Sequence, residues 1–123
     1  VCLHDPVAGV GGMNHFLMPN APSDREAPAR YGDTSTDLLI EKMLQAGARH
    51  SRLVAGVFGG GAVVPELRYG TRIGDQNGGL ALRLLQQRDI AIVKVDLGGE
   101  KARKIFFRTD NGNTLVHRHG EGR

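Results

Sequence analysis

The chain has 123 residues, of which 40% are hydrophobic and 24% are charged. This length allows one domain with a hydrophobic core but not two, and the composition excludes a disordered chain. The net charge is +3, but the basic residues are scattered and tryptophan is absent, so we expect no nucleic-acid surface. No apolar run reaches the length of a membrane-spanning helix, and a single cysteine excludes an internal disulfide. Together these features favour a cytoplasmic protein without membrane insertion.

Two strands joined by a turn are predicted at the start of the chain. Asp5-Pro6 and Gly9 are typical turn residues, because proline fixes φ, aspartate binds its own backbone and glycine tolerates positive φ. Apolar residues flank this turn, at 2–3 before it and at 10–18 after it. The pattern therefore predicts two strands connected by a short loop.

The second of these strands carries two glycines and a histidine. Alternation along a strand would place Asn14 and His15 on opposite faces, each with apolar neighbours. Apolar residues on both faces predict a strand that is buried on each side. Within such a strand, Gly11 and Gly12 indicate either a bulge or the close approach of a ligand. A histidine in a buried strand is more often a hydrogen-bonded core residue than a functional group, and position alone favours that interpretation for His15.

Two helices are predicted further along the chain. The first spans about residues 34–46, with an N-cap among residues 33–35 and Gly47 at the C′ position. The second spans about residues 73–88. The apolar stripes at helical spacing are Leu38, Leu39, Ile40, Met43 and Leu44 in the first helix and Leu80, Ala81, Leu84 and Leu85 in the second.

The remaining strands follow from short β-branched and aromatic runs. We predict strands over residues 53–58 and 90–95, and a hairpin in which residues 105–107 and 115–116 flank the turn 109–113. Three glycines follow the first of these strands, at 59–61. They lack the Lys-Ser/Thr that completes a phosphate-binding loop, so a flexible loop is the favoured interpretation.

A metal site is considered only at the end of the chain. His117 and His119 would share one face of a strand, which is a spacing that a metal can bridge. No third ligand lies nearby in the sequence, so a solvated tail is favoured over a metal site.

Several short motifs, each weak alone, occur in a specific order and spacing. They are Asp5-Pro6 followed by Gly11-Gly12, His15 and Pro19; Arg30-Tyr31-Gly32-Asp33; Val57-Phe58-Gly59-Gly60 with Ala62; Ile73-Gly74 with Asn77; and Asp96-Leu97-Gly98-Gly99. Together they resemble the bacterial chemoreceptor glutamine deamidases, the CheD family. In that family the last motif continues to Gly-Arg, whereas this chain has Ala102-Arg103, which predicts a stiffer loop.

The resemblance implies a mechanism in which His15 is the catalytic base. A cysteine gives its proton to the histidine, and the thiolate attacks the carbonyl of a glutamine side chain. The imidazolium then protonates the departing ammonia, and water activated by the histidine hydrolyses the thioester to glutamate. In the family a threonine orients the histidine, and no metal or organic cofactor is needed.

The only cysteine of the chain, Cys2, is not expected to be the nucleophile. The family's cysteine lies roughly seventeen positions before the histidine, which is a position before Val1. Cys2 instead matches a small apolar position of a strand, where a buried thiol packs as a hydrophobic group. We therefore expect residues 1–123 to form a single deamidase-like domain that lacks its N-terminal segment.

The fold predicted from these elements is α+β, with mixed, largely antiparallel sheets of about six to eight strands and two helices packed on one side. The resemblance implies the cysteine-hydrolase fold of deamidating toxins. It also implies a hydrolase that deamidates glutamines on methyl-accepting chemotaxis receptors, with the chemotaxis phosphatase CheC as a further partner. Two alternatives are a non-catalytic module that docks on the receptors or the phosphatase, and a cysteine hydrolase that acts on another amide.

Overall fold

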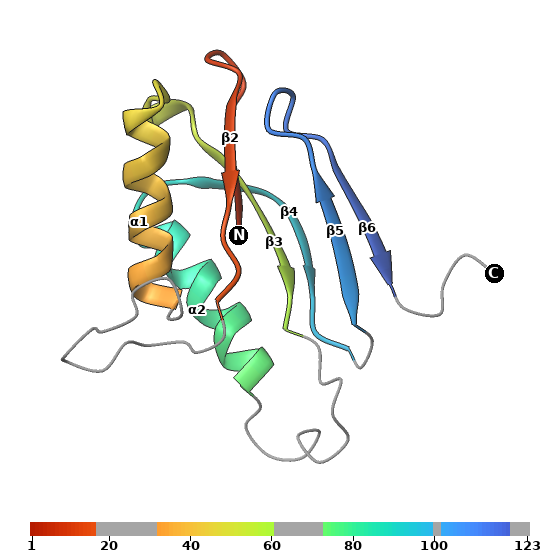
Figure 1. The fold of residues 1–123 in the computed structure, drawn as a ribbon. Helices are drawn as coiled ribbons and strands as arrows, with labels where there is room; N and C mark the ends of the chain where they lie inside the picture. The colour runs from red at the N-terminus through yellow and green to blue at the C-terminus, as the bar shows by residue number, and fades with distance from the viewer. Residues whose placement is uncertain (17–31, 61–72, 100–101, 119–123) are drawn as a thin grey trace.

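The computed structural model describes residues 1–16, 32–60, 73–99 and 102–118. In these residues, two helices cover one face of a four-stranded sheet, and a two-stranded hairpin covers the other face (Figure 1). The elements in chain order are β1 (Cys2–Asp5), β2 (Val10–Met13), α1 (Gly32–Gln45), the short 3-10 helix η2 (His50–Arg52), β3 (Val54–Gly59), α2 (Ile73–Gln87), β4 (Ala91–Leu97), β5 (Arg103–Phe107) and β6 (Thr114–Arg118).

The four-stranded sheet has the order β2-β1-β3-β4. β1 runs antiparallel to both of its neighbours, whereas β3 and β4 run parallel and are connected through α2. The hairpin strands β5 and β6 pair antiparallel. The prediction of an α+β fold with a mixed, largely antiparallel sheet system is therefore confirmed, and both predicted helices pack on one side of the sheet.

β2 differs from its prediction. It is an edge strand that is only half-buried and ends at Met13, whose side chain is 48% exposed. The central strand β1 is the one that is buried along its length. The apolar run that predicted a doubly buried strand continues past the end of β2, so Asn14, His15 and Phe16 do not alternate as strand residues.

The glycines of β2 allow the chain itself to approach from both sides. The pairing of β1 with β2 has no register shift, so the predicted bulge is absent from this pair. A Cβ atom at Gly11 would lie 2.7 Å from the carbonyl oxygen of Thr109 in the hairpin turn, and one at Gly12 would lie 3.0 Å from Leu39 of α1. Glycine at both positions therefore lets β2 fit between the hairpin and α1.

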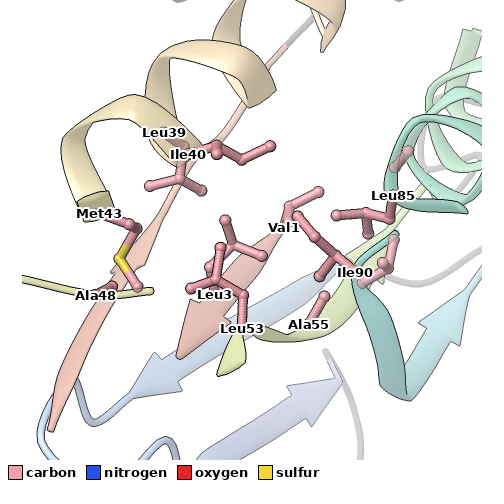
Figure 2. Close-up of a cluster of buried hydrophobic side chains, with 12 residues drawn as sticks. Val1, Leu3, Leu39, Ile40, Met43, Ala48, Leu53, Ala55, Leu85 and Ile90 are labelled. Carbon is pink, nitrogen blue, oxygen red and sulfur yellow. The ribbon is translucent and has the colours of Figure 1, made fainter. Parts of the chain in front are cut away.

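The hydrophobic core lies between the helices and the sheet. Figure 2 shows Leu3 of β1 among the α1 residues Leu39 and Met43 and Leu85 of α2. The predicted stripe of α2 is buried in full, and that of α1 is buried except for Leu44 and Leu38. These apolar faces are what attach both helices to the same side of the sheet.

Both helices end as their sequences dictate. At the end of α1, Gly47 has φ +106°, the Ala48 N–H donates to the carbonyl oxygen of Met43, and the Gly47 N–H donates to that of Leu44. This is the Schellman pattern that the glycine predicted. The end of α2 repeats it, but with Asp89 at φ +54° in the position of the glycine.

Candidate active site

A pocket of about 460 Å³ opens at one end of the layered fold. Three chain segments form its wall: the start of β1 with the end of β2, the end of β3, and the start of β5. The lining residues that the structure describes are Val1, Cys2, Met13, Asn14, His15, Phe58, Gly59, Gly60, Ala102, Arg103, Lys104 and Ile105.

His15 lies in the wall of this pocket, two residues after the end of β2. Its side chain is exposed, so the interpretation as a buried core histidine is wrong. The physical reason is that β2 ends before His15, which releases this residue from the sheet. An accessible imidazole beside a pocket has the environment that a general base requires, because substrate and water can both reach it.

Asn14 fixes the segment that carries His15. Its backbone N–H donates to the carbonyl oxygen of Val1 at 3.0 Å, which joins the segment to the start of β1. Its side-chain Nδ2 donates to Ser35 Oγ at 3.1 Å and to Thr36 Oγ1 at 3.3 Å, in the first turns of α1. The residue before the histidine is therefore attached to two different elements. No local sequence pattern indicates the side-chain contacts to α1, because they join residues 21 and 22 positions apart.

Cys2 contributes to the same pocket wall but has the wrong environment for a nucleophile. The residue is 3% exposed and lies in β1, where it pairs with Met13 and Gly56. Burial raises the pKa of its thiol. A raised pKa lowers the thiolate fraction at neutral pH, which is the opposite of what nucleophilic attack needs. The structure agrees with the expectation that Cys2 is a buried strand residue.

The Asp5-Pro6 turn lies at the other end of β1 from the pocket. The Asp5 carboxylate accepts backbone N–H groups from Val7 and Ala8, as the turn sequence predicted, and a third from Arg49 at 2.9 Å. Arg52 completes the set with an ion pair at 2.9 Å. Burial alone would raise the pKa of Asp5, but these donors lower it well below its usual value. The Asp5 carboxylate therefore has a structural role, in which it joins its own turn to Arg49 and Arg52.

A buried histidine of β1 also serves the fold. His4 is 6% exposed and lies on the face of β1 that the hairpin covers. Its Nε2 is 3.0 Å from the carbonyl oxygen of Asp110, in the turn between β5 and β6. A Cβ atom at Gly112 would lie 2.6 Å from His4 Nδ1, so the glycine at φ +76° allows the hairpin turn to close over this ring.

The other motif residues divide between the pocket and the scaffold. Phe58 and Gly59 at the end of β3, and Gly60 after it, line the pocket. Asn77 lies in the first part of α2 and is not among the described lining residues. Pro19, the Arg30-Tyr31 pair and Ala62 lie outside the described residues.

Arg103 links the pocket wall to the loops beside it. Its side chain is 6% exposed and pairs with Asp96 of β4, which also accepts a hydrogen bond from Arg118 of β6. Burial alone would raise the pKa of Asp96, but the two guanidinium groups lower it. This carboxylate is therefore ionised at neutral pH and holds two strands of the hairpin against β4.

The described residues contain no group of three side chains suited to a metal ion. His117 is exposed on β6, whereas His119 lies outside the described part of the chain, so the spacing of these two histidines stays untested. Among the helices that the structure describes, none has the length and apolar character needed to cross a membrane.

Comparison with known proteins identifies the family. A family model described as "CheD chemotactic sensory transduction" matches residues 17–118. The chain belongs to the CheD family. The resemblance that the motifs predicted is thus confirmed. The matched segment of the CheD model begins two residues after His15, so the match itself does not include the histidine.

Relatives of this CheD-family chain carry names that state an activity. A probable chemoreceptor glutamine deamidase CheD 1 from Anaeromyxobacter dehalogenans is 48% identical over 116 residues, which cover 94% of this chain and 67% of that protein. Proteins named probable chemoreceptor glutamine deamidase CheD from Bordetella avium and Stenotrophomonas maltophilia (strain K279a) are 42% and 43% identical, over 95% of this chain. The chain spans 52% and 59% of their lengths. It therefore corresponds to between about half and two thirds of these relatives.

Proposed function

We propose that the intact protein hydrolyses specific glutamine side chains of methyl-accepting chemotaxis receptors to glutamate and ammonia, with His15 as the general base. The names of the relatives support the reaction and the receptor as substrate. The observation that carries the role of His15 is its position: an exposed imidazole in the wall of a pocket that Val1 also lines.

The place of Val1 bears directly on the nucleophile. A cysteine about seventeen positions before His15 would precede Val1 by about three residues. Three residues of extended chain span at most about 10 Å. Because Val1 and His15 line the same pocket and Asn14 is bonded to Val1, a thiol at that distance can reach the imidazole. The proposal therefore places the cysteine in residues upstream of Val1 and not at Cys2.

The chemistry then follows in two steps. The imidazole of His15 takes the thiol proton, and the thiolate forms a bond to the glutamine carbonyl carbon. The tetrahedral intermediate collapses as the imidazolium gives its proton to the leaving amide nitrogen, which departs as ammonia. Water, deprotonated by the same imidazole, attacks the thioester, and the carbon–sulfur bond breaks to release glutamate and the thiol. No metal or organic cofactor enters either step.

The product places the protein in a signalling pathway. Conversion of glutamine to glutamate adds a negative charge to the receptor and creates a carboxylate that can be methylated. The substrate makes the cytoplasm the site of action, with CheC as a second partner where that phosphatase is present. The competing function is a binding module that docks on the receptors or on CheC without catalysis.

The deciding experiment uses the full-length protein with a purified receptor fragment and follows ammonia release together with the mass change of the receptor. His15→Ala should lower the rate by about 10²–10⁴-fold, the usual contribution of a general base. His50→Ala is the matched control, because His50 is also exposed, while the flanking residues Arg49 and Arg52 bond Asp5 at the other end of β1 from the pocket. Replacement of the upstream cysteine should abolish the reaction.

The deamidase and the non-catalytic binding module predict different outcomes in this assay. Receptor binding by both histidine variants, with catalysis lost only in His15→Ala, supports the deamidase. A full-length protein that carries the upstream cysteine and binds the receptor, yet releases no ammonia, would instead establish the binding module.

A further inference from the structure

One nearly buried side chain of the pocket wall has no part in the proposed reaction. The side chain of Arg103 is only 6% exposed, although arginine is among the residues that proteins most rarely bury. It begins β5 and lines the pocket that contains His15. A buried guanidinium requires partners for its donors, and those partners show what the residue holds in place.

Three nitrogen atoms of Arg103 contact three different points of the backbone and side chains. Nε donates to Asp96 Oδ1 at 3.1 Å, Nη1 to the carbonyl oxygen of Gly59 at 3.2 Å, and Nη2 to that of Gly98 at 2.6 Å. These acceptors belong to the end of β3, the end of β4 and the turn that follows β4. One guanidinium therefore joins the two parallel strands at the end where the pocket opens.

The backbone that Arg103 contacts lies where the parallel strands β3 and β4 end, and it contains glycines with positive φ. Gly59 has φ +116° and Gly98 has φ +80°, and an added Cβ atom at either position would meet nothing within 4 Å. Glycine in such open space is the most flexible element that a chain can contain. Gly59 is the last residue of β3 and pairs with Leu97 of β4, and its carbonyl oxygen also accepts the Gly98 N–H at 2.9 Å.

The charge of Arg103 is already neutralised within the fold. Asp96 accepts hydrogen bonds from both Arg103 and Arg118 and is 17% exposed. The guanidinium is therefore directed at the loops and at Asp96, and its contribution at the pocket is geometric. Lysine cannot reproduce this contribution, because a single ammonium lacks the planar fork that reaches three acceptors at once.

We propose that Arg103 is a positioning residue, which fixes the Gly59–Gly60 segment as a rigid wall of the pocket opposite the His15 segment. This inference rests on the proposed deamidase function. An amide is a poor electrophile, so its carbonyl must be held in a fixed orientation while it is attacked. A glycine wall that moved would lose that orientation, even with the histidine and the nucleophile in place.

The test compares Arg103→Lys with Arg108→Lys in the full-length protein. Arg108 is the matched control, because it also forms a two-point pair with a carboxylate, that of Asp110, but is exposed in the hairpin turn. For Arg103→Lys we expect kcat to fall by about 10- to 100-fold with KM changed less than about threefold, since misplacement by 1 Å can cost about 10²-fold. Arg108→Lys should leave both unchanged.

A second readout does not depend on activity. Hydrogen exchange of the Gly98 amide, which bonds to Gly59, should become about tenfold faster or more in Arg103→Lys, because a charged hydrogen bond beside it is lost. Should that variant fail to fold, Asp96→Asn weakens the same anchor and should give a smaller rise. If the wild-type protein has no deamidase activity, the proposed function fails, and the exchange rate alone still tests whether Arg103 holds this wall.

Two results would overturn the inference. The first is an unchanged Gly98 exchange rate in a folded Arg103→Lys protein. The second is a lower thermal midpoint with kcat unchanged well below that midpoint, which is the behaviour of a residue with a purely structural role.

Discussion

Asn14 offers the sharpest test of how the His15 segment is held. Asn14→Ala removes the Nδ2 donor from Ser35 Oγ and Thr36 Oγ1, which belong to residues that are 5% and 0% exposed. Each neutral hydrogen bond contributes about 0.5–1.5 kcal/mol, so the pair is worth about 2 kcal/mol. The backbone bond from Asn14 to Val1 is kept. We therefore expect the free energy of unfolding to fall by about 2 kcal/mol without loss of the fold.

The assay is urea denaturation of the single variants Asn14→Ala and Ser35→Ala and of the double variant. A direct hydrogen bond predicts a coupling energy of about 1 kcal/mol between the two sites. Asn113→Ala is the control, since that asparagine is exposed in the hairpin turn. Deamidase turnover should fall by about tenfold or more in Asn14→Ala, because the segment that carries His15 loses its side-chain attachment to α1. A coupling energy within about 0.5 kcal/mol of zero would refute the reasoning.

Three further predictions concern the scaffold. Asp89→Gly should raise the free energy of unfolding by about 0.5–1 kcal/mol, because φ +54° strains a non-glycine residue. Gly47→Asp should lower it by a similar amount, because it places a non-glycine residue at positive φ. Urea denaturation measures both changes. Gly11→Ala should destabilise the protein by about 1–3 kcal/mol, because the alanine methyl group would lie 2.7 Å from a carbonyl oxygen of the hairpin. Gly79→Ala should stabilise the protein, because its methyl group meets only the flexible end of an arginine side chain. Calorimetry of the two variants should show thermal midpoints shifted in opposite directions. The pKa of Asp5 is lower in the folded protein than its unfolded value of about 4. Asp5 therefore contributes stability that is complete above the unfolded pKa and is lost as the pH falls through the folded pKa. In Asp5→Asn the free energy of unfolding should fall less steeply with acid, as measured by pH-jump denaturation.

Local chemistry explains the parts of the fold that the sequence predicted well. Gly47 is placed at the C′ position because only a residue that tolerates positive φ can close the Schellman pattern. The hairpin turn at 109–113 and the Asp5 turn follow from the same kind of short-range preference. These features are encoded within a few residues, so they can be inferred without knowledge of the tertiary structure.

The errors have a common physical origin in contacts between distant residues. An apolar run predicts burial, but whether β2 is central or at the edge depends on where β1 and β3 pair. The pairs Asp5–Arg52 and Arg103–Gly59 join residues 47 and 44 positions apart, and no local pattern encodes them. The proposed role of His15 comes only from the family motif, since periodicity alone placed this residue in the core.

The fold places some of the family motifs at the pocket and others away from it. The pocket lies at the start of β1, beside Val1, whereas the Asp5 turn lies at its end, so the Asp-Pro motif is away from the candidate active site. The Asp5 carboxylate accepts hydrogen bonds from its own turn and from Arg49. The glycines at the end of β3 lie instead at the pocket, at the carboxyl end of the parallel pair, where sheets commonly bind their ligands. A shared motif therefore does not by itself indicate a catalytic residue. In this chain, His15 and Gly59–Gly60 are the motif residues that line the pocket, and Arg103 joins Gly59 to the turn at Gly98.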